Sequence, residues 1–483
     1  MDDQSTTESS HALIEPRWTG VKQVMAMSGP IIIASLSYTI MQFADQVMVA
    51  RISTDALAAS GSAGIWSFTL STVLLGIIGC VSTFVSQCVG KGDKHLAARY
   101  AWQGLYLSIP IGLSALILWP LAYPLFNSMG HTPEVTRLEI IYFQFRSLGY
   151  FGMGWMTAMS AFFQAINRSS IPMYIAIVGN ALNLVLNYLL IFGKFGFPEW
   201  GIAGAAIATV TATYFQCICL QATFMNRHYN GLFGTRQAWN VDVHRIKELI
   251  RIGLPSGMTM FLDIANWAIF SSFIVGYFGT EQLAAHNVAL SFMHVSFMPA
   301  VGLNQGIAPI VGQWIGARDI RRAKLRTYTA LKIATGYMLV MGIFFALFGG
   351  LLIELIFSKD PKVISLGHKL LILAAIFQAF DATNIVCAGA LRGAGDTRWM
   401  MWTTLIMAYT VFLPLALLFS FPMGGEAYGA WIAATIFIIV LSFFLFTRFR
   451  GGRWSNINIF MNEQNNSQEM QGGNRPELTG EVK

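Results

Sequence analysis

The chain of 483 residues is 55% hydrophobic and only 11% charged, with a mean hydropathy of +0.55. An average soluble domain is about 25% charged, so this composition excludes an ordinary soluble protein and indicates one that lies in a lipid bilayer. The net charge of +7 does not indicate a nucleic-acid partner, because most lysines and arginines lie between apolar runs, where the positive-inside rule places them.

Twelve apolar runs, each long enough to cross a bilayer, follow one another along the chain. Backbone groups in lipid must hydrogen-bond internally, so we expect helices, and the alternation typical of an outer-membrane barrel is absent. The sequence therefore predicts an all-α integral membrane protein. The runs lie near 24–50, 57–90, 100–127, 140–166, 171–193, 201–226, 252–278, 282–316, 327–357, 364–391, 399–421 and 427–447.

The second half of the chain repeats features of the first half. The segment DALAASGSAG at Asp55 resembles EQLAAHNVAL at Glu281, and VSQCVGKGD at Val85 resembles VGQWIGARD at Val311. Both pairs have the same offset of 226 residues. Six spans per half insert both halves the same way up, which predicts two six-helix lobes related by a pseudo-two-fold axis along the membrane normal.

The predicted lobes cover residues 24–226 and 251–450. A cytoplasmic segment, 1–23, precedes them, and a cytoplasmic linker, 227–250, joins them. The polar tail, 451–483, has a composition that predicts disorder. The distribution of lysine and arginine orients the chain with both ends in the cytoplasm, which we interpret as a multi-pass protein of the cell (inner) membrane.

Two aspartates lie near the middle of predicted spans, where a charge costs about 3 kcal/mol on insertion scales. Asp381 is 12 residues after Lys369 and 11 before Arg392, about 17 Å from either flank in a helix. Asp263 is 12 residues after Arg251 and is similarly deep. Such residues are expected to be functional.

The repeat supports this interpretation, because Ser37 and Trp155 stand where the second half has Asp263 and Asp381. If the fold alone required these carboxylates, both halves would carry them. The alternative is a hydrogen bond that holds a neighbouring helix, and the asymmetry favours function. Asp45 lies nearer the outer surface, and for it both interpretations stay open.

Three amides, Asn180, Asn183 and Asn187, share one face of the fifth predicted helix. Amide oxygens can coordinate a hard cation or bond a protonated carboxyl, and amides also form hydrogen bonds between membrane helices. The residues alone do not separate these two roles.

The tetrad Gly-Ala-Gly-Asp that ends at Asp396 resembles the motif of intramembrane aspartyl proteases. Such an enzyme needs two aspartates that share a proton, and Asp381 lies about 22 Å away along a helix. The Tyr-Asp pair of those proteases is absent from the sequence. We therefore expect no enzymatic activity, and expect Asp396 to cap the eleventh helix or to pair with Arg392 or Arg398.

Five stretches together resemble the multidrug and toxic compound extrusion (MATE) transporters, and most of all the bacterial NorM-like branch. They are ADQVMVARISTDALAAS, NLVLNYLLIFGKFGFPEWGIAGAAIAT, GLPSGMTMFLDIANW, GTEQLAAHNVALSF and CAGALRGAGDTR. The resemblance implies two lobes that form a V around a central cavity. It also implies alternating access, in which a drug moves outward while Na⁺ or H⁺ moves inward.

The resemblance also assigns site residues. It implies that Asp263 and Asp381 couple transport to the cation, with Na⁺ as one candidate ligand. Phe377 stands where the family has a tyrosine one turn before Asp381, which removes an oxygen ligand. Asp263 stands where glutamate is usual. Both departures leave the identity of the cation open.

A secondary cation or polar site in the first lobe follows from the same resemblance. It comprises Asp45, Asn183, Asn187 and Thr209.

We expect a monomeric transporter without a cofactor that exports cationic or amphiphilic small molecules. Ionised carboxylates can hold a lipophilic cation, and a bound proton or Na⁺ weakens that attraction, which couples the two ligands. The alternative is a flippase of lipid-linked oligosaccharides from the same superfamily. Its cavity would need cations for pyrophosphate, and Arg146 and Lys332 are the chief basic residues within the spans.

Overall fold

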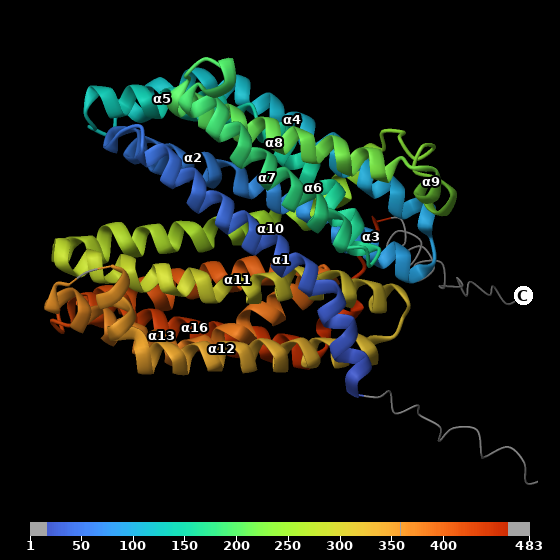
Figure 1. Ribbon diagram of the computed structural model, residues 1–483. Helices are drawn as coiled ribbons and strands as arrows, with labels where there is room; N and C mark the ends of the chain where they lie inside the picture. The colour runs from blue at the N-terminus through green and yellow to red at the C-terminus, as the bar shows by residue number, and fades with distance from the viewer. Residues whose placement is uncertain (1–16, 358, 462–483) are drawn as a thin grey trace, which may run out of the picture.

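The computed structural model describes residues 17–357 and 359–461. Within these ranges the chain is helical throughout and contains no strand. The helices form two groups that approach each other at one end and diverge at the other (Figure 1). The predicted all-α fold with two lobes in a V is therefore confirmed.

The first lobe contains two spans that are divided into consecutive helices, one at Cys80 and one near Gly149. A short helix, α9 (Arg227–Phe233), follows the lobe. The helices of the first lobe are α1 (Arg17–Ala50), α2 (Thr54–Gly79), α3 (Val81–Lys91), α4 (Lys94–Asn127), α5 (Pro133–Ser147), α6 (Tyr150–Ala165), α7 (Ser170–Phe192), the one-turn η1 (Lys194–Gly196) and α8 (Gly201–Phe224).

The second lobe contains two spans that change to π-helical or 3₁₀ geometry partway along. Its first helix begins at Val243, inside the predicted linker. The elements are α10 (Val243–Ile269) with η2 (Phe270–Ile274) and η3 (Val275–Phe278), α11 (Thr280–Gly316), α12 (Ile320–Ile356), α13 (Pro361–Ala394), α14 (Thr397–Met407) with η4 (Ala408–Phe412) and α15 (Leu413–Ser420), α16 (Glu426–Gly451) and η5 (Arg453–Asn456).

Ten helical stretches of the described chain are long and apolar enough to cross a membrane. The two other predicted spans, 140–166 and 282–316, are also helical, as α5 with α6 and as α11. Each of the twelve predicted spans therefore corresponds to helix.

The end at which the lobes meet is called the closed end below, and its opposite the open end. At the closed end α3 crosses α11 with backbone packed on backbone. A Cβ atom at Gly90 would lie 2.0 Å from the carbonyl oxygen of Gln313, and one at Gly316 would lie 2.2 Å from that of Gln87. Both pairs, Gly90 with Gly316 and Gln87 with Gln313, have the repeat offset of 226. The crossing therefore lies on the predicted pseudo-two-fold axis.

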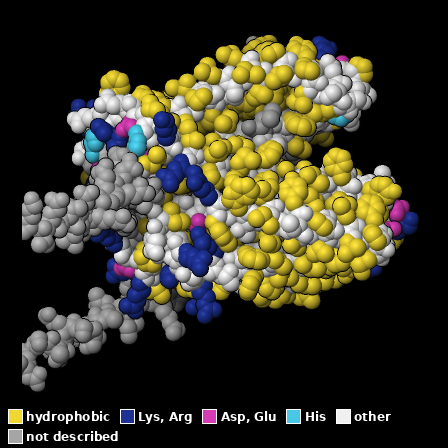
Figure 2. Space-filling model, turned by 180° about the vertical axis from the view of Figure 1, so that it is seen from behind, with side chains coloured by type: hydrophobic (Ala, Val, Ile, Leu, Met, Phe, Trp, Pro, Cys, Tyr) yellow, Lys and Arg dark blue, Asp and Glu magenta, His cyan; other side chains and the backbone are white. Residues whose placement is uncertain are grey.

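The two glutamines of this crossing also hydrogen-bond across the lobes. Gln87 Nε2 donates to the carbonyl of Gly393 at 3.1 Å, and Gln313 Nε2 donates to that of Ala165 at 2.7 Å. Each acceptor lies at the end of the fourth span of the opposite lobe. Figure 2 shows that the cleft between the lobes is open at the other end of the molecule.

Helix α1 contacts both lobes. Near its start, Gln23 Oε1 accepts a hydrogen bond from Arg326 Nε of α12 at 2.6 Å, and Met27 belongs to the core of the second lobe. Farther along, Ser37 Oγ accepts one from Asn180 Nδ2 of α7 at 3.0 Å. The first half of α1 thus packs on the second lobe although its span belongs to the first repeat.

The prediction of a disordered tail from residue 451 onward is wrong for residues 451–461. Trp454 and Ile459 are buried, as is Phe460. Apolar side chains in this short stretch pack into both lobes, whereas the asparagine- and glutamine-rich composition that suggested disorder begins after it. Residues 462–483 of the tail and 1–16 of the N-terminal segment lie outside the described residues.

Candidate functional site

The structure brings the four residues predicted for the first lobe into one hydrogen-bonded cluster on α1, α7 and α8. Asn187 Nδ2 donates to Asp45 Oδ1 at 2.5 Å. The amide of Asn183 lies 3.3 Å from Thr209 Oγ1 and 2.9 Å from Asp45 Oδ1, and when its nitrogen is assigned to the side facing the carboxylate it also donates to Asp45. Both asparagines are fully buried. Asp45 itself is only half-buried.

Sequence analysis named Arg146 only as a basic residue within the spans and missed its relation to this cluster. In the structure Arg146 of α5 hydrogen-bonds the phenol of Tyr38 on α1. It also interacts electrostatically with Asp45. The carboxylate of the first lobe therefore has a resident positive charge nearby, though not as a direct ion pair among those found in the described residues.

A cavity of about 580 Å³ lies beside the cluster, between α1, α7, α8 and the middle of α11. Asn183 and Thr209 line it and thereby connect it to Asp45. No Asp, Glu, Lys or Arg of the described chain lines this cavity. Its polar lining includes six side-chain amides, which are those of Gln42, Gln164, Asn180, Asn183, Gln216 and Gln305.

The two aspartates predicted for the second lobe interact with each other. Asp381 on α13 is buried, and its Oδ1 accepts a hydrogen bond from Asn384 Nδ2 at 3.3 Å. Asp263 on α10 is exposed and interacts electrostatically with Asp381 and with Arg392. Arg392 Nε is itself buried without a hydrogen-bond partner in the described chain. The structure therefore brings the two carboxylates into one electrostatic environment without a direct hydrogen bond.

Two further amides flank these aspartates and were missed by sequence reasoning. Asn266 follows Asp263 by one turn of α10, and Gln378 precedes Asp381 by one turn of α13. Both amides are buried. Within the described residues neither polar atom of Asn266 has a hydrogen-bond partner, and Gln378 Oε1 has none, although its Nε2 donates to Ser296 Oγ at 2.9 Å. Such unsatisfied groups cost about 1–3 kcal/mol each, which a bound polar species would offset.

Phe377 is fully buried and packs toward Trp431 of α16, with ring centroids 6.4 Å apart. The indole Nε1 of Trp431 donates to His286 Nδ1 at 3.0 Å, and His286 Nε2 lies 2.7 Å from Ser271 Oγ. Because Nδ1 accepts, Nε2 carries the proton and donates to the serine. His286 is therefore a packed, hydrogen-bonded histidine.

Asp396 does not act as predicted. It occupies the position before α14, but its side chain makes no capping hydrogen bond there. Its Oδ2 instead pairs with Arg448 Nε of α16 at 2.7 Å, rather than with Arg392 or Arg398. The tertiary contact offers a buried charge-assisted bond, which outweighs the local cap.

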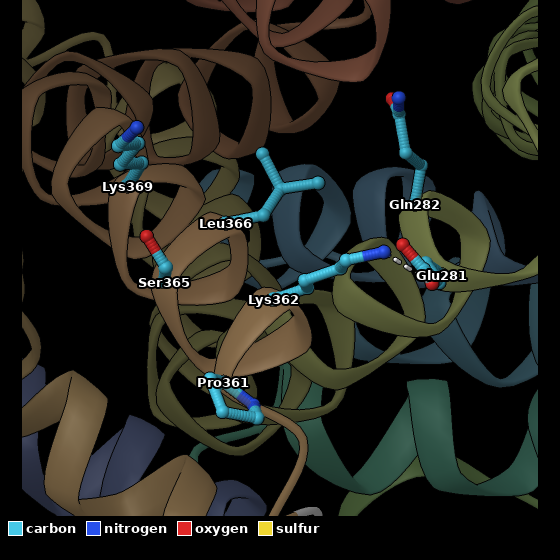
Figure 3. A pocket seen from close by; sticks show the side chains of 7 residues that line it. All are labelled: Glu281, Gln282, Pro361, Lys362, Ser365, Leu366 and Lys369. Carbon is cyan, nitrogen blue, oxygen red and sulfur yellow. Dashed lines mark hydrogen bonds and ion pairs between the residues drawn. The ribbon is translucent and has the colours of Figure 1, made fainter.

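A second pocket, of about 420 Å³, lies where α13 and α11 begin, at the open end. Figure 3 shows Lys362 reaching toward Glu281, with Ser365 and Lys369 farther along α13. The Lys362 Nζ to Glu281 Oε1 distance is 3.0 Å, and both side chains are exposed. An exposed ion pair of this kind contributes at most about 1 kcal/mol to the stability of the fold. The lining of this pocket contains none of the aspartates or asparagines of the two clusters described above.

Aspartate and amide clusters within two helical lobes around a cleft are typical of a membrane protein with the architecture of a secondary transporter. The MatE family model matches residues 30–189 and 255–418, once in each half. These matches cover more than half of the chain. The chain therefore belongs to the MatE family, the multidrug and toxic compound extrusion proteins that its motifs resemble.

Curated relatives match over most of the chain. The probable multidrug resistance protein NorM of Pseudomonas aeruginosa is 32% identical over 436 residues, which are 88% of this chain and 86% of the relative. The protein of the same description from Pseudomonas putida is 30% identical over 421 residues, or 86% and 90% of the two chains.

Solved structures share the fold. An outward-facing multidrug resistance MATE family transporter has a TM-score of 0.83 at 21% identity, covering 90% of this chain and 96% of that one. The eukaryotic MATE transporter AtDTX14 has a TM-score of 0.78 at 19% identity, covering 91% and 97%. At these identities the likeness shows the fold alone.

Proposed function

We propose that the protein is a secondary active multidrug efflux transporter, which exchanges Na⁺ or H⁺ for cationic or amphiphilic small molecules by alternating access. Membership of the MatE family and the NorM descriptions of its relatives support the multidrug class. The observation that carries the coupling is the position of Asn183, which both lines the large cavity and hydrogen-bonds Asp45.

Asn183 provides a physical link between the two ligands. When Asp45 is ionised, its Oδ1 accepts hydrogen bonds from Asn183 and Asn187. A proton or Na⁺ on this carboxylate competes for the same oxygens, so the amide of Asn183 must reorient toward the cavity. When the cavity lining depends on cation occupancy, the affinity for the substrate differs between the cation-bound and cation-free states. That difference in affinity is the coupling free energy between cation and substrate.

The second lobe supplies the other cation-responsive group. Asp263 and Asp381 repel each other when both are ionised, so binding of one positive charge between them is favoured. Asn266 Oδ1 and Gln378 Oε1, which have no hydrogen-bond partner within the described residues, offer oxygen ligands on the same two helices. Hard cations in proteins bind to oxygens of this kind.

The closed end is assigned to the cytoplasm. Lysine and arginine side chains gather at this end of the molecule in Figure 2, and the described chain begins and ends there in Figure 1. The positive-inside rule then places both ends in the cytoplasm and the protein in the cell membrane, with the cleft open outward.

The cavity favours amphiphiles over lipid-linked pyrophosphates as cargo. A pyrophosphate requires positive charge, and no lysine or arginine of the described chain lines the cavity. Arg146, which hydrogen-bonds the cavity-lining Tyr38, is also engaged with Asp45. Amides and apolar side chains instead suit a molecule with an aromatic body and a few polar groups.

The test is dye efflux from proteoliposomes, driven separately by a Na⁺ gradient and by a pH gradient. We expect one gradient to drive efflux in the wild type, and expect Asp263→Asn and Asp381→Asn each to abolish it. Asp55→Asn is the matched control, because Asp55 is exposed in the first turn of α2. Efflux that neither gradient drives would refute cation coupling, and flipping of a pyrophosphate lipid would favour the flippase.

A further inference from the structure

Residues 452–461, here called the C-terminal strap, cross from the second lobe to the first at the closed end. The strap leaves α16 after Gly451 and is anchored to the second lobe by Trp454. The indole Nε1 donates to the carbonyl of Phe449 at 2.7 Å, and the ring stacks on Phe449 at 5.4 Å. Trp454 belongs to the buried core of the second lobe.

The other end of the strap lies in the core of the first lobe. The ring of Phe460 packs against Phe84 of α3 at 5.9 Å and against Tyr100 of α4 at 6.0 Å. Lys91 Nζ lies 4.1 Å from the centroid of the same ring. A buried aromatic side chain with these contacts is a strong anchor.

Between these anchors the strap fills the junction of the lobes. Ile459 is fully buried and belongs to the core of the first lobe. It also contacts Gly395, the left-handed residue that ends α13 of the second lobe. A Cβ atom there would stand 2.4 Å from Ile459 Cγ2. The side chain thus packs against both lobes at once.

The strap ends on a buried carboxylate. Glu248, in the second turn of α10, accepts a hydrogen bond from the Met461 backbone N–H through Oε1 at 2.6 Å. Its Oε2 accepts one from the hydroxyl of Tyr100. Hydrogen bonds to an ionised acceptor are about twice as strong as neutral ones. One carboxylate therefore joins the strap, the first lobe and the start of the second.

We propose that the C-terminal strap is a latch that holds the closed end shut and must leave the first lobe before the cleft can open there. Residues 454–460 span at most about 20 Å when fully extended, which limits lobe separation while both anchors stay docked. The inference rests on the proposed alternating access, in which the contact of Gln87 with Gly393 beside the strap has to break.

The first experiment measures opening of the closed end directly. Ser86→Cys places a thiol in the buried crossing of α3 and α11, and a water-soluble maleimide reports its exposure in vesicles. Adding Phe460→Ala should raise the labelling rate roughly tenfold, the change produced by about 1.4 kcal/mol. Asn456→Ala, at an exposed position of the strap, should leave the rate unchanged. An unchanged rate in Phe460→Ala would overturn the latch.

The second experiment locks the strap in place instead of releasing it. Lys91→Cys with Phe460→Cys, bridged by a short cleavable dithiol cross-linker, fixes the strap to the first lobe. Dye efflux should stop when the bridge forms and return when it is cleaved, whereas unaffected efflux would overturn the latch. Failure of the proposed function would appear differently, because uncross-linked wild type would then show no efflux while the labelling experiment still reported on the strap.

Discussion

Replacing Gly316 with alanine should weaken the closed end by forcing α3 and α11 apart. The new Cβ atom would stand 2.2 Å from the carbonyl oxygen of Gln87, whereas ordinary contact begins near 3.4 Å. The helices must therefore separate by roughly 1 Å, and the neighbour is backbone, which cannot rotate away. Overpacking of this kind costs typically about 1–3 kcal/mol.

That cost falls on the closed state alone, because the crossing exists only while the lobes meet. A shift of 1–3 kcal/mol changes a two-state equilibrium by roughly 5- to 150-fold. We expect the maleimide labelling rate of Ser86→Cys to rise by a factor in this range in Gly316→Ala. Because of the pseudo-two-fold axis, Gly90→Ala should behave in the same way.

The control is Gly61→Ala in α2, where a Cβ atom would meet nothing within 4 Å. Alanine in an exposed helix interior is favoured over glycine by about 0.5–1 kcal/mol, so this variant should be neutral or slightly stabilised. Labelling of Gly316→Ala at the wild-type rate would refute the reasoning about the crossing. An effect of Gly316→Ala without one of Gly90→Ala would refute its symmetry.

Three other substitutions test the buried polar groups. Asn266→Leu should raise thermal stability by about 1–3 kcal/mol, because it removes an amide without partners, while ion-driven efflux falls; a loss of stability would contradict this. Asp396→Asn should lower stability by up to about 3–5 kcal/mol, because it leaves Arg448 without its partner charge, and a melting temperature equal to wild type would exclude the pair as a stabilising contact. Asn183→Leu should weaken the dependence of dye affinity on the coupling cation, because the link to Asp45 is lost; unchanged dependence in a binding titration would refute the link.

The spans and the repeat could be predicted from the sequence, because each depends on local pattern. Apolar length sets the spans, and the offset of 226 residues revealed the repeat, whose Gly90 and Gly316 meet the opposite helix at the crossing. The spacing of Asn183 and Asn187 likewise placed both on the helix face that meets Asp45. Such features require only helical geometry and a bilayer.

Contacts between distant segments could not be predicted in this way. Asp396 has a favourable local role as a cap, and only the approach of α16 reveals that Arg448 takes its carboxylate. The strap was assigned to a disordered tail because composition averages over a window, whereas three buried apolar side chains, those of Trp454, Ile459 and Phe460, suffice to anchor ten residues. The position of Arg146 within a span says nothing of the neighbours that its guanidinium meets.

The helix crossing at the closed end is repeated in both lobes, whereas the carboxylate clusters are not. This difference indicates that the two lobes have different roles in transport. The crossing of α3 with α11 is symmetric, as a hinge or seal shared by two equivalent lobes must be. The polar clusters are not symmetric, since Asp45 is hydrogen-bonded to Asn187 and lies beside the cavity-lining Asn183, while the second lobe has Asn266, whose two polar atoms have no partner within the described residues. A carboxylate already bonded to an amide exchanges that bond when a cation binds, whereas one beside an unpartnered amide gains most of its stabilisation from the cation itself. We infer that the first lobe responds to substrate and cation together, whereas the second lobe supplies the larger share of cation affinity.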